Sequence, residues 1–199
     1  MIIFTPILEK NLKINQSIPK FDGISMTLED FQNWNPEVED GIKYEWDNGI
    51  VEAEDRMKLD ELHIYTNLVN ALQTRKNITN RDYFISEVNI YLKNLNKIRR
   101  PDIIYLKEEE IQKTKQKLDF IPQFVIEIVS ESNSINEVKT KIRDYFSSGV
   151  KIVWIILPNY KEVKVYKSIK EVKICLKDDF CEAGDVIPDF NITVNKIFN

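Results

Sequence analysis

The chain has 199 residues, of which 43% are hydrophobic and 30% are charged, an ordinary composition for a globular protein that builds one core. Its formal net charge of -4 argues against a protein that holds nucleic acid by bulk positive charge alone. A local basic strip beside an acidic site is still compatible with that charge.

Neither a membrane protein nor a secreted one is expected. No apolar run has the length of a membrane span, and residues 1–6 lack the basic segment that begins a signal peptide. Cys175 and Cys181 are the only cysteines, too few for a zinc site made from cysteine pairs. We therefore expect a cytoplasmic protein with reduced thiols.

The first predicted elements are an arm and a short helix. Residues 1–25 lack a clear period and are interpreted as an N-terminal arm, before a single domain over residues 26–199. Thr27, with Asp30 three residues later, has the spacing of a capping box and predicts the start of a helix. The apolar residues of this helix are Leu28, Phe31 and Trp34.

The dipeptide Asn48-Gly49 predicts a tight hairpin, because both residues of such a turn must accept a positive φ. A two-residue turn would place Glu45 opposite Glu52. Like charges that face each other destabilise a strand pair, so either solvent separates them or a cation attracts them. Glu45, between two aromatic residues, is the better candidate for a metal ligand, directly or through a water.

A helix is predicted over residues 58–75 from its apolar spacing. The expected apolar arc consists of Leu62, Tyr65, Val69 and Leu72. His63, the only histidine, lies on the polar side of this helix. A solvated surface histidine and a histidine that faces a cleft are equally open interpretations.

The rest of the chain alternates strands with one helix. The predicted strands are 83–92, 101–106, 124–130, 151–157, 163–166 and 172–176. Residues 107–119 are charged and form a loop or a short helix, while residues 134–148 form a helix that Ser132 or Asn133 caps and Gly149 ends. Lys93, Lys97, Arg99 and Arg100 form a basic strip that is either a solvated face or a DNA contact. This order predicts a mixed α/β fold with a central sheet flanked by helices.

Two acids interrupt apolar strands. Glu127 has only apolar neighbours from Phe124 to Val129, and Asp102 begins the strand that follows Pro101. Burying a lone carboxylate costs several kcal/mol, roughly, unless a cation or strong donors compensate it. Taken singly, Glu127 could form an ion pair with an arginine, and Asp102 could simply cap the start of its strand. Taken together, however, they favour a hard-oxygen site for Mg²⁺ or Mn²⁺.

If such a metal site acts on a phosphate, it also needs a lysine that orients a water or stabilises the developing negative charge on the phosphate. Position 129, two residues after Glu127, is valine. The next helix offers Lys139 and Lys141 on opposite edges of its apolar arc, and the period alone does not choose between them.

The order of these motifs resembles the Uma2 family of restriction-endonuclease-like proteins over residues 26–198. The matching segments are residues 27–31, Tyr44-Glu45-Trp46-Asp47-Asn48-Gly49, a helix that His63 leads, Arg99-Arg100-Pro101-Asp102, Val125-Ile126-Glu127-Ile128-Val129-Ser130, Lys141-x3-Tyr145-x3-Gly149 and residues 184–188. The Arg-Pro-Asp and Glu-x-Val-Ser segments are the more specific of these.

The resemblance implies a PD-(D/E)XK core, a restriction-endonuclease-like mixed central sheet with an N-terminal helix and hairpin. Asp102 and Glu127 would bind Mg²⁺ or Mn²⁺, Glu45 would match the early acid, and Lys141 would match the displaced catalytic lysine. The expected surroundings of the metal are the backbone of Ile128 and, as accessory residues, His63, Tyr145 and Arg100.

The function that this implies is a metal-dependent endonuclease that hydrolyses phosphodiester bonds of DNA, as a homodimer by analogy with enzymes that cut both strands. The alternative is a non-catalytic nuclease-fold module that binds nucleic acid or a protein partner.

Overall fold

The computed structural model describes residues 19–34, 42–56, 58–75, 82–115, 120–129 and 133–199. Within these residues the larger sheet has six strands in the order β10-β9-β8-β7-β6-β3. They are β3 (Asp82–Ser86), β6 (Ile103–Lys107), β7 (Phe124–Ile128), β8 (Ile152–Leu157), β9 (Glu162–Ser168) and β10 (Glu171–Leu176). β7 and β8 pair in parallel, which requires a crossover, and α4 (Ile135–Ser147) supplies it. The other pairs are antiparallel, so the sheet is mixed.

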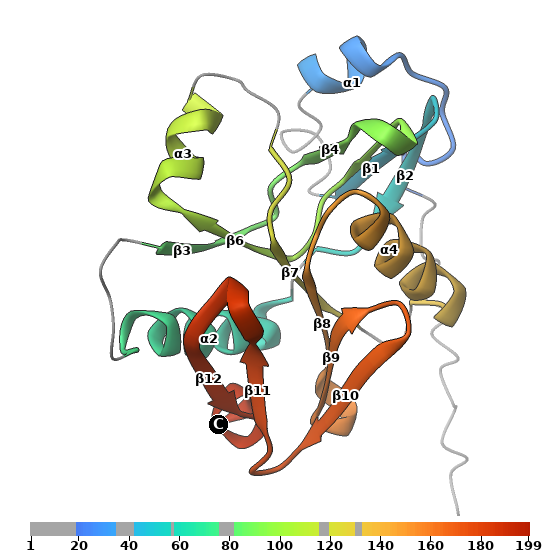
Figure 1. Ribbon diagram of the computed structural model, residues 1–199. Coiled ribbons are helices and arrows are strands. Elements are labelled where there is room, and N and C mark those ends of the chain that lie inside the picture. Colours follow the sequence, from blue (N-terminus) through green and yellow to red (C-terminus); the bar gives the residue numbers. More distant parts are fainter. Residues whose placement is uncertain (1–18, 35–41, 57, 76–81, 116–119, 130–132) are drawn as a thin grey trace, which may run out of the picture.

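Helices cover both faces of this sheet (Figure 1). On one face, α2 (Leu62–Gln73) packs with the hairpin of β11 (Phe180–Ala183) and β12 (Ile187–Thr193), and with α5 (Val194–Phe198). On the other face, α4 and α3 (Glu108–Lys115) pack against the alternate residues of the same strands. Side chains of a strand alternate between faces, so residue parity tells which layer each one meets.

A smaller sheet carries the hairpin. Its strand order is β2-β1-β5-β4, and the strands are β1 (Lys43–Asp47), β2 (Ile50–Glu54), β4 (Ile90–Leu92) and β5 (Lys97–Arg99). α1 (Leu28–Asn33) covers it, and Phe31 joins Tyr44 and Trp46 in a third apolar cluster. The described part of the arm lies on this sheet, where the Gly23 N–H donates to the Val51 carbonyl at 2.8 Å.

Several local predictions are confirmed. Thr27 caps α1, and its hydroxyl accepts from the Asp30 N–H at 3.1 Å. Asn48 and Gly49 both have positive φ, 49° and 97°, and the hairpin places Glu45 opposite Glu52. The buried strand β7, the strand β8 and the meander of β9 and β10 also occur where the sequence predicts them.

The prediction of one strand over residues 83–92 is wrong. The chain leaves β3 at Glu87, whose φ is 51°, and enters β4 in the other sheet. Residues 93–100 were expected to be a loop, but they contain the 3₁₀ turn η3 (Lys93–Leu95) and β5. Asn96, with a φ of 54°, closes this second hairpin. A positive φ usually falls on glycine and is uncommon for other residues. Because Glu87 and Asn96 adopt it here, no glycine in the sequence marks these two turns.

The predicted arc of α2 is confirmed in part. Leu72 is buried, and Tyr65 and Val69 pack against the core. Leu62, however, is 49% exposed, and Ile64 and Leu68 are the other buried residues of the helix. A 3₁₀ turn, η2 (Leu59–Glu61), begins this segment, and the further 3₁₀ turns η4 (Pro158–Tyr160) and η5 (Gly184–Val186) lie between later strands.

The cap of α4 is Ser134, one or two residues after the predicted Asn133 and Ser132, of which Ser132 lies outside the described residues. The Glu137 side chain completes this capping box, because it accepts from the Ser134 N–H at 2.8 Å. The predicted end of the helix at Gly149 agrees with the structure, where this glycine has a φ of 103°.

Both cysteines are buried free thiols. Among the described residues, none of the helices has the length and apolar character needed to span a membrane.

Candidate active site

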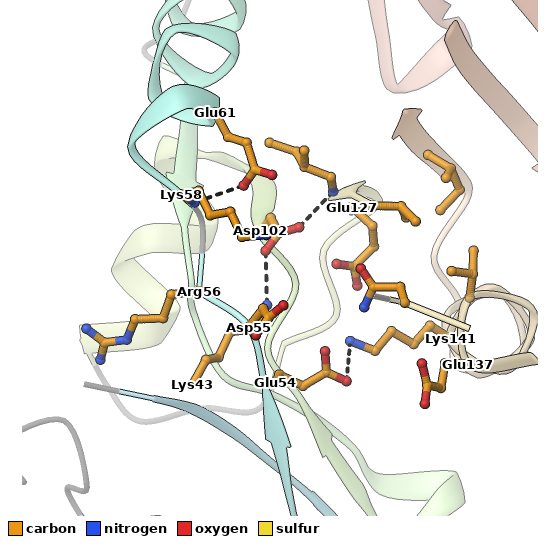
Figure 2. Close-up of a pocket in the computed structure, with 15 residues that line it drawn as sticks. Lys43, Glu54, Asp55, Arg56, Lys58, Glu61, Asp102, Glu127, Glu137 and Lys141 are labelled. Carbon is orange, nitrogen blue, oxygen red and sulfur yellow. Dashed lines mark hydrogen bonds and ion pairs between the residues drawn. The ribbon is translucent and has the colours of Figure 1, made fainter. Parts of the chain in front are cut away.

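Asp102 and Glu127 lie on the same face of the larger sheet. Ile103 pairs with Ile126 in the antiparallel ladder of β6 and β7, and the same register one residue further sets Asp102 against Glu127. By parity they share the face with Val125, Ile104 and the rest of the cluster under α4. Both line one pocket between the hairpin and α4, as Figure 2 shows.

Asp102 is 6% exposed, and each of its oxygens has a donor. The Ile128 N–H donates to Oδ2 at 2.7 Å, and Nζ of Lys43 donates to Oδ1 at 3.0 Å (Figure 2). The backbone of Ile128, expected near a metal, therefore lies at the site. Burial alone would lower the pKa of Lys43, but the charges of Asp102 and Glu127 outweigh it and raise this pKa.

Glu127 is 5% exposed and receives a short hydrogen bond from the Tyr145 hydroxyl. Burial raises the pKa of Glu127 to about 7; the charge of Asp102 adds to the rise, and Lys141 and Lys43 oppose it. A pKa this high means that the nearby positive charge does not fully compensate the cost of burying the ionised carboxylate. An added cation would correct that deficit.

Of the two candidate lysines on α4, Lys141 lines the pocket and Lys139 is exposed. Nζ of Lys141 lies 2.9 Å from Oε1 of Glu54 and 3.3 Å from Oε1 of Glu45. Burial would lower the pKa of Lys141, but these acids and Glu127 raise it well above its ordinary value. We therefore expect Lys141 to be charged at neutral pH.

Glu45 is fully buried beneath the pocket and does not line it. Oε2 of Glu45 is 2.8 Å from Nη1 of Arg99, and Oε1 accepts from the Arg100 N–H at 2.8 Å. Burial alone would raise the pKa of Glu45, but Lys141, Arg99 and Lys43 lower it to about 2. The geometry places Glu45 as an anchor for Lys141, and its predicted role as a metal ligand finds no support in these contacts.

Two residues of the expected basic strip, Lys97 and Arg99, belong to an ion-pair cluster instead, whereas Lys93 is exposed. Arg99 binds Glu45, Asp144 and the exposed end of Glu52, and Lys97 binds Asp47 and Asp144. We call these six residues the Arg99 cluster. Arg99 is 4% exposed, so neither the solvated face nor a DNA contact describes it.

The three accessory candidates separate. Tyr145 is fully buried and contacts Glu127. Arg100 does not line the pocket, and its Nε donates instead to the Glu87 carbonyl at 2.8 Å. His63 is exposed on α2 and does not line the pocket. Lys58 and Glu61, just before α2, do line the pocket, and Glu61 is 9% exposed.

Sequence reasoning missed Lys43, Glu54 and Glu61. Lys43 is the first residue of its strand, and two of the next four residues are aromatic, so the lysine could be read as a solvated strand end. Glu54 has the parity of Glu52 along β2 and was therefore a detectable companion of that acid. Glu61 gave no signal, because acids are common in the first turn of a helix.

The carboxylate oxygens in the pocket are suitable ligands for a hard divalent cation. Six acids and four bases line it, which leaves a formal excess of two negative charges; they are Glu54, Asp55, Glu61, Asp102, Glu127 and Glu137, with Lys43, Arg56, Lys58 and Lys141. Within the described part of the chain no group of three histidine, cysteine or acidic side chains is placed to hold a metal ion. Mg²⁺ commonly uses only one or two carboxylates and keeps several waters, so Asp102 and Glu127 are the two residues that could hold it.

A mixed sheet between helices, with a carboxylate pair and a buried lysine on one face, defines a restriction-endonuclease-like α/β protein. The chain matches the Uma2 family, described as "Putative restriction endonuclease", over residues 28–195, and it belongs to that family.

Among solved structures, the chain is similar to a protein from Anabaena variabilis ATCC 29413, described as a putative nuclease belonging to DUF820. The two have a TM-score of 0.72 and 18% sequence identity, and the match covers 87% of this chain and 97% of that one. At this identity the likeness shows the fold. A search of curated proteins found no match.

Proposed function

We propose that this protein is a metal-dependent endonuclease that hydrolyses phosphodiester bonds of DNA. The observation that carries the proposal is the pairing of Asp102 and Glu127 on one pocket wall, with the ammonium of Lys141 facing them from α4. Membership in a family described as putative restriction endonucleases supports the same reaction class.

The residues divide the chemistry among them. Asp102 and Glu127 would hold Mg²⁺ or Mn²⁺, which supplies a water of lowered pKa and offsets charge on the phosphate. Lys141 would stabilise the negative charge that develops on phosphate oxygens as water attacks phosphorus and a P–O bond breaks. Its raised pKa favours this electrostatic role over that of a general base.

Other residues hold this arrangement in place. Tyr145 fixes one oxygen of Glu127, and the Ile128 N–H fixes one oxygen of Asp102. Glu45 and Glu54 fix the Lys141 ammonium between them. A catalytic group must be held within a fraction of an ångström of its working position, so such neighbours matter as much as the groups that touch substrate.

The test combines binding with cleavage. Wild type should bind Mn²⁺ in calorimetry and nick supercoiled plasmid only when Mg²⁺ or Mn²⁺ is added. Asp102→Asn should lose both properties, while Asp185→Asn, an exposed acid next to β12, should keep them. Equal nicking by wild type and Asp102→Asn would mean that the activity comes from a contaminant.

One observation favours the alternative of a non-catalytic module that binds nucleic acid. Lys43 already neutralises Asp102 in the structure, so the acid has a structural role without any metal. A protein that binds DNA but neither binds Mn²⁺ nor cuts plasmid would establish that reading. Substrates of both kinds, duplex and single-stranded, belong in the assay, since the geometry is compatible with either.

A further inference from the structure

Lys43 lies where a cation of the site is expected. It is the first residue of β1, is 2% exposed and lines the pocket beside Asp102 and Glu127. Its Nζ is 3.0 Å from Oδ1 of Asp102, and the charge of Glu127 also attracts it.

The second oxygen of Asp102 sharpens this placement. Oδ2 of Asp102 accepts from the Ile128 N–H, which is fixed in the backbone, so a cation that replaces a side-chain partner of Asp102 would do so at Oδ1. Oδ1 is also the oxygen that Lys43 holds. An ammonium and a divalent cation carry the same sign, and both at one carboxylate oxygen repel each other strongly in a buried site.

We propose that Lys43 is a tethered counter-ion, which holds Oδ1 of Asp102 until a divalent cation displaces it. The inference rests on the metal-dependent function proposed above. Two buried carboxylates without a cation would destabilise the fold, and Lys43 relieves that cost before metal arrives. A lysine suits the task because its flexible four-carbon stem lets the ammonium move away, whereas the planar fork of an arginine favours a fixed bidentate pair.

The test measures metal affinity rather than cleavage. Mn²⁺ is titrated calorimetrically into wild type, Lys43→Met and a matched control, Lys97→Met. Lys97 is also a largely buried lysine in an ion pair, but it binds Asp47 and Asp144 away from the pocket. Lys43→Met should bind Mn²⁺ more tightly than wild type by about tenfold or more, because the competing charge is gone. Lys97→Met should keep the wild-type affinity.

Equal affinity of wild type and Lys43→Met overturns the proposal. If the affinities are equal and Lys43→Met has a higher KM for DNA, Lys43 is a phosphate contact instead. Asp102→Asn distinguishes failure of the Lys43 exchange from failure of the metal site. If neither wild type nor Lys43→Met binds Mn²⁺, or if Asp102→Asn binds it as well as wild type, the proposed metal site itself fails.

A second measurement needs no variant and covers the case in which Lys43→Met does not fold. In a crystal structure of wild type soaked with Mn²⁺, Nζ of Lys43 should have left hydrogen-bond distance of Oδ1 of Asp102. A metal bound to Asp102 with the Lys43 contact unchanged would contradict the exchange.

Discussion

Two buried glutamates of this protein respond to burial in opposite ways. Glu45, in the Arg99 cluster, has a pKa lowered to about 2, whereas the pKa of Glu127, in the pocket, is raised to about 7. Both are almost completely removed from water. The difference lies in their partners. Glu45 accepts hydrogen bonds from Arg99, Lys141 and a backbone N–H. Glu127 accepts one from a hydroxyl, and the charges of Asp102 and Glu45 partly offset those of Lys141 and Lys43.

The comparison separates structural acids from acids that are available for chemistry. A buried carboxylate whose charge is fully compensated is part of the scaffold, and adding a cation gains it little. A buried carboxylate whose charge is poorly compensated is a candidate for a metal or for proton transfer. By this criterion Glu127, rather than Glu45, marks the candidate site.

The largest expected effect is on cleavage by Glu127→Gln. If Glu127 binds the metal, replacing one carboxylate oxygen with an amide should reduce plasmid nicking by about 10⁴-fold or more. The fold should remain, because the Tyr145 hydroxyl can still donate to the amide oxygen. Nicking rates and circular dichroism of the same preparation check both parts. Activity within tenfold of wild type would remove Glu127 from the reaction.

Next in size is the stability of the Arg99 cluster. Arg99→Met leaves Glu45 buried without its main hydrogen-bonding partner, so the free energy of unfolding should fall by about 3–5 kcal/mol. Arg143→Met, at an exposed position on α4, should change it by less than about 0.5 kcal/mol. Urea denaturation of the three proteins measures this. Equal stability of the two variants would show that the cluster is not structural.

The pH dependence of stability should have opposite signs at the two glutamates in protein kept free of metal with EDTA. The folded pKa of Glu45, about 2, is below its ordinary 4.5, so its stabilisation is present above pH 4.5 and is lost as pH falls toward 2. The folded pKa of Glu127, about 7, is above 4.5, so stability is full below pH 4.5 and decreases as pH rises through 7.

Variants test these signs directly. At pH 8, Glu45→Gln should be less stable than wild type and Glu127→Gln more stable, each by on the order of 2–3 kcal/mol. The gain of Glu127→Gln should shrink as pH is lowered from 8 to 5, whereas the loss of Glu45→Gln should persist over that range. Denaturant unfolding at several pH values measures both. A shared sign would refute the contrast between the two sites.

Much of this site could be predicted from the sequence, because the strongest signals were local. Glu127 stands in an apolar strand, Asn48-Gly49 sets the hairpin register, and the resemblance selects Lys141 over Lys139. A polar residue in an apolar run carries a physical cost that can be noticed without coordinates. Asp102 and Glu127 were predicted to point to one place, and they line the same pocket.

The remainder depends on contacts between distant segments. Nothing near Arg99 in the chain reveals that it lies over Glu45 and Asp144, since those partners come from another sheet strand and from a helix. The same reason hid the role of Lys43, whose partner Asp102 is 59 residues away. The break at Glu87 was invisible because a positive φ at glutamate has no local sequence signal.

The smallest expected effects separate the accessory residues. Tyr145→Phe removes the hydroxyl that holds one oxygen of Glu127, while the ring still fills its buried position, so nicking should fall by about tenfold with the fold intact. His63→Ala should leave the nicking rate within about twofold, because this histidine is exposed on α2 and does not line the pocket. Rates are compared at saturating Mn²⁺, with Mn²⁺ affinity measured alongside, since a misplaced Glu127 should also weaken metal binding. If His63→Ala proved the more damaging change, the reacting phosphate would have to lie nearer α2, and the division between the two buried glutamates would no longer locate the site.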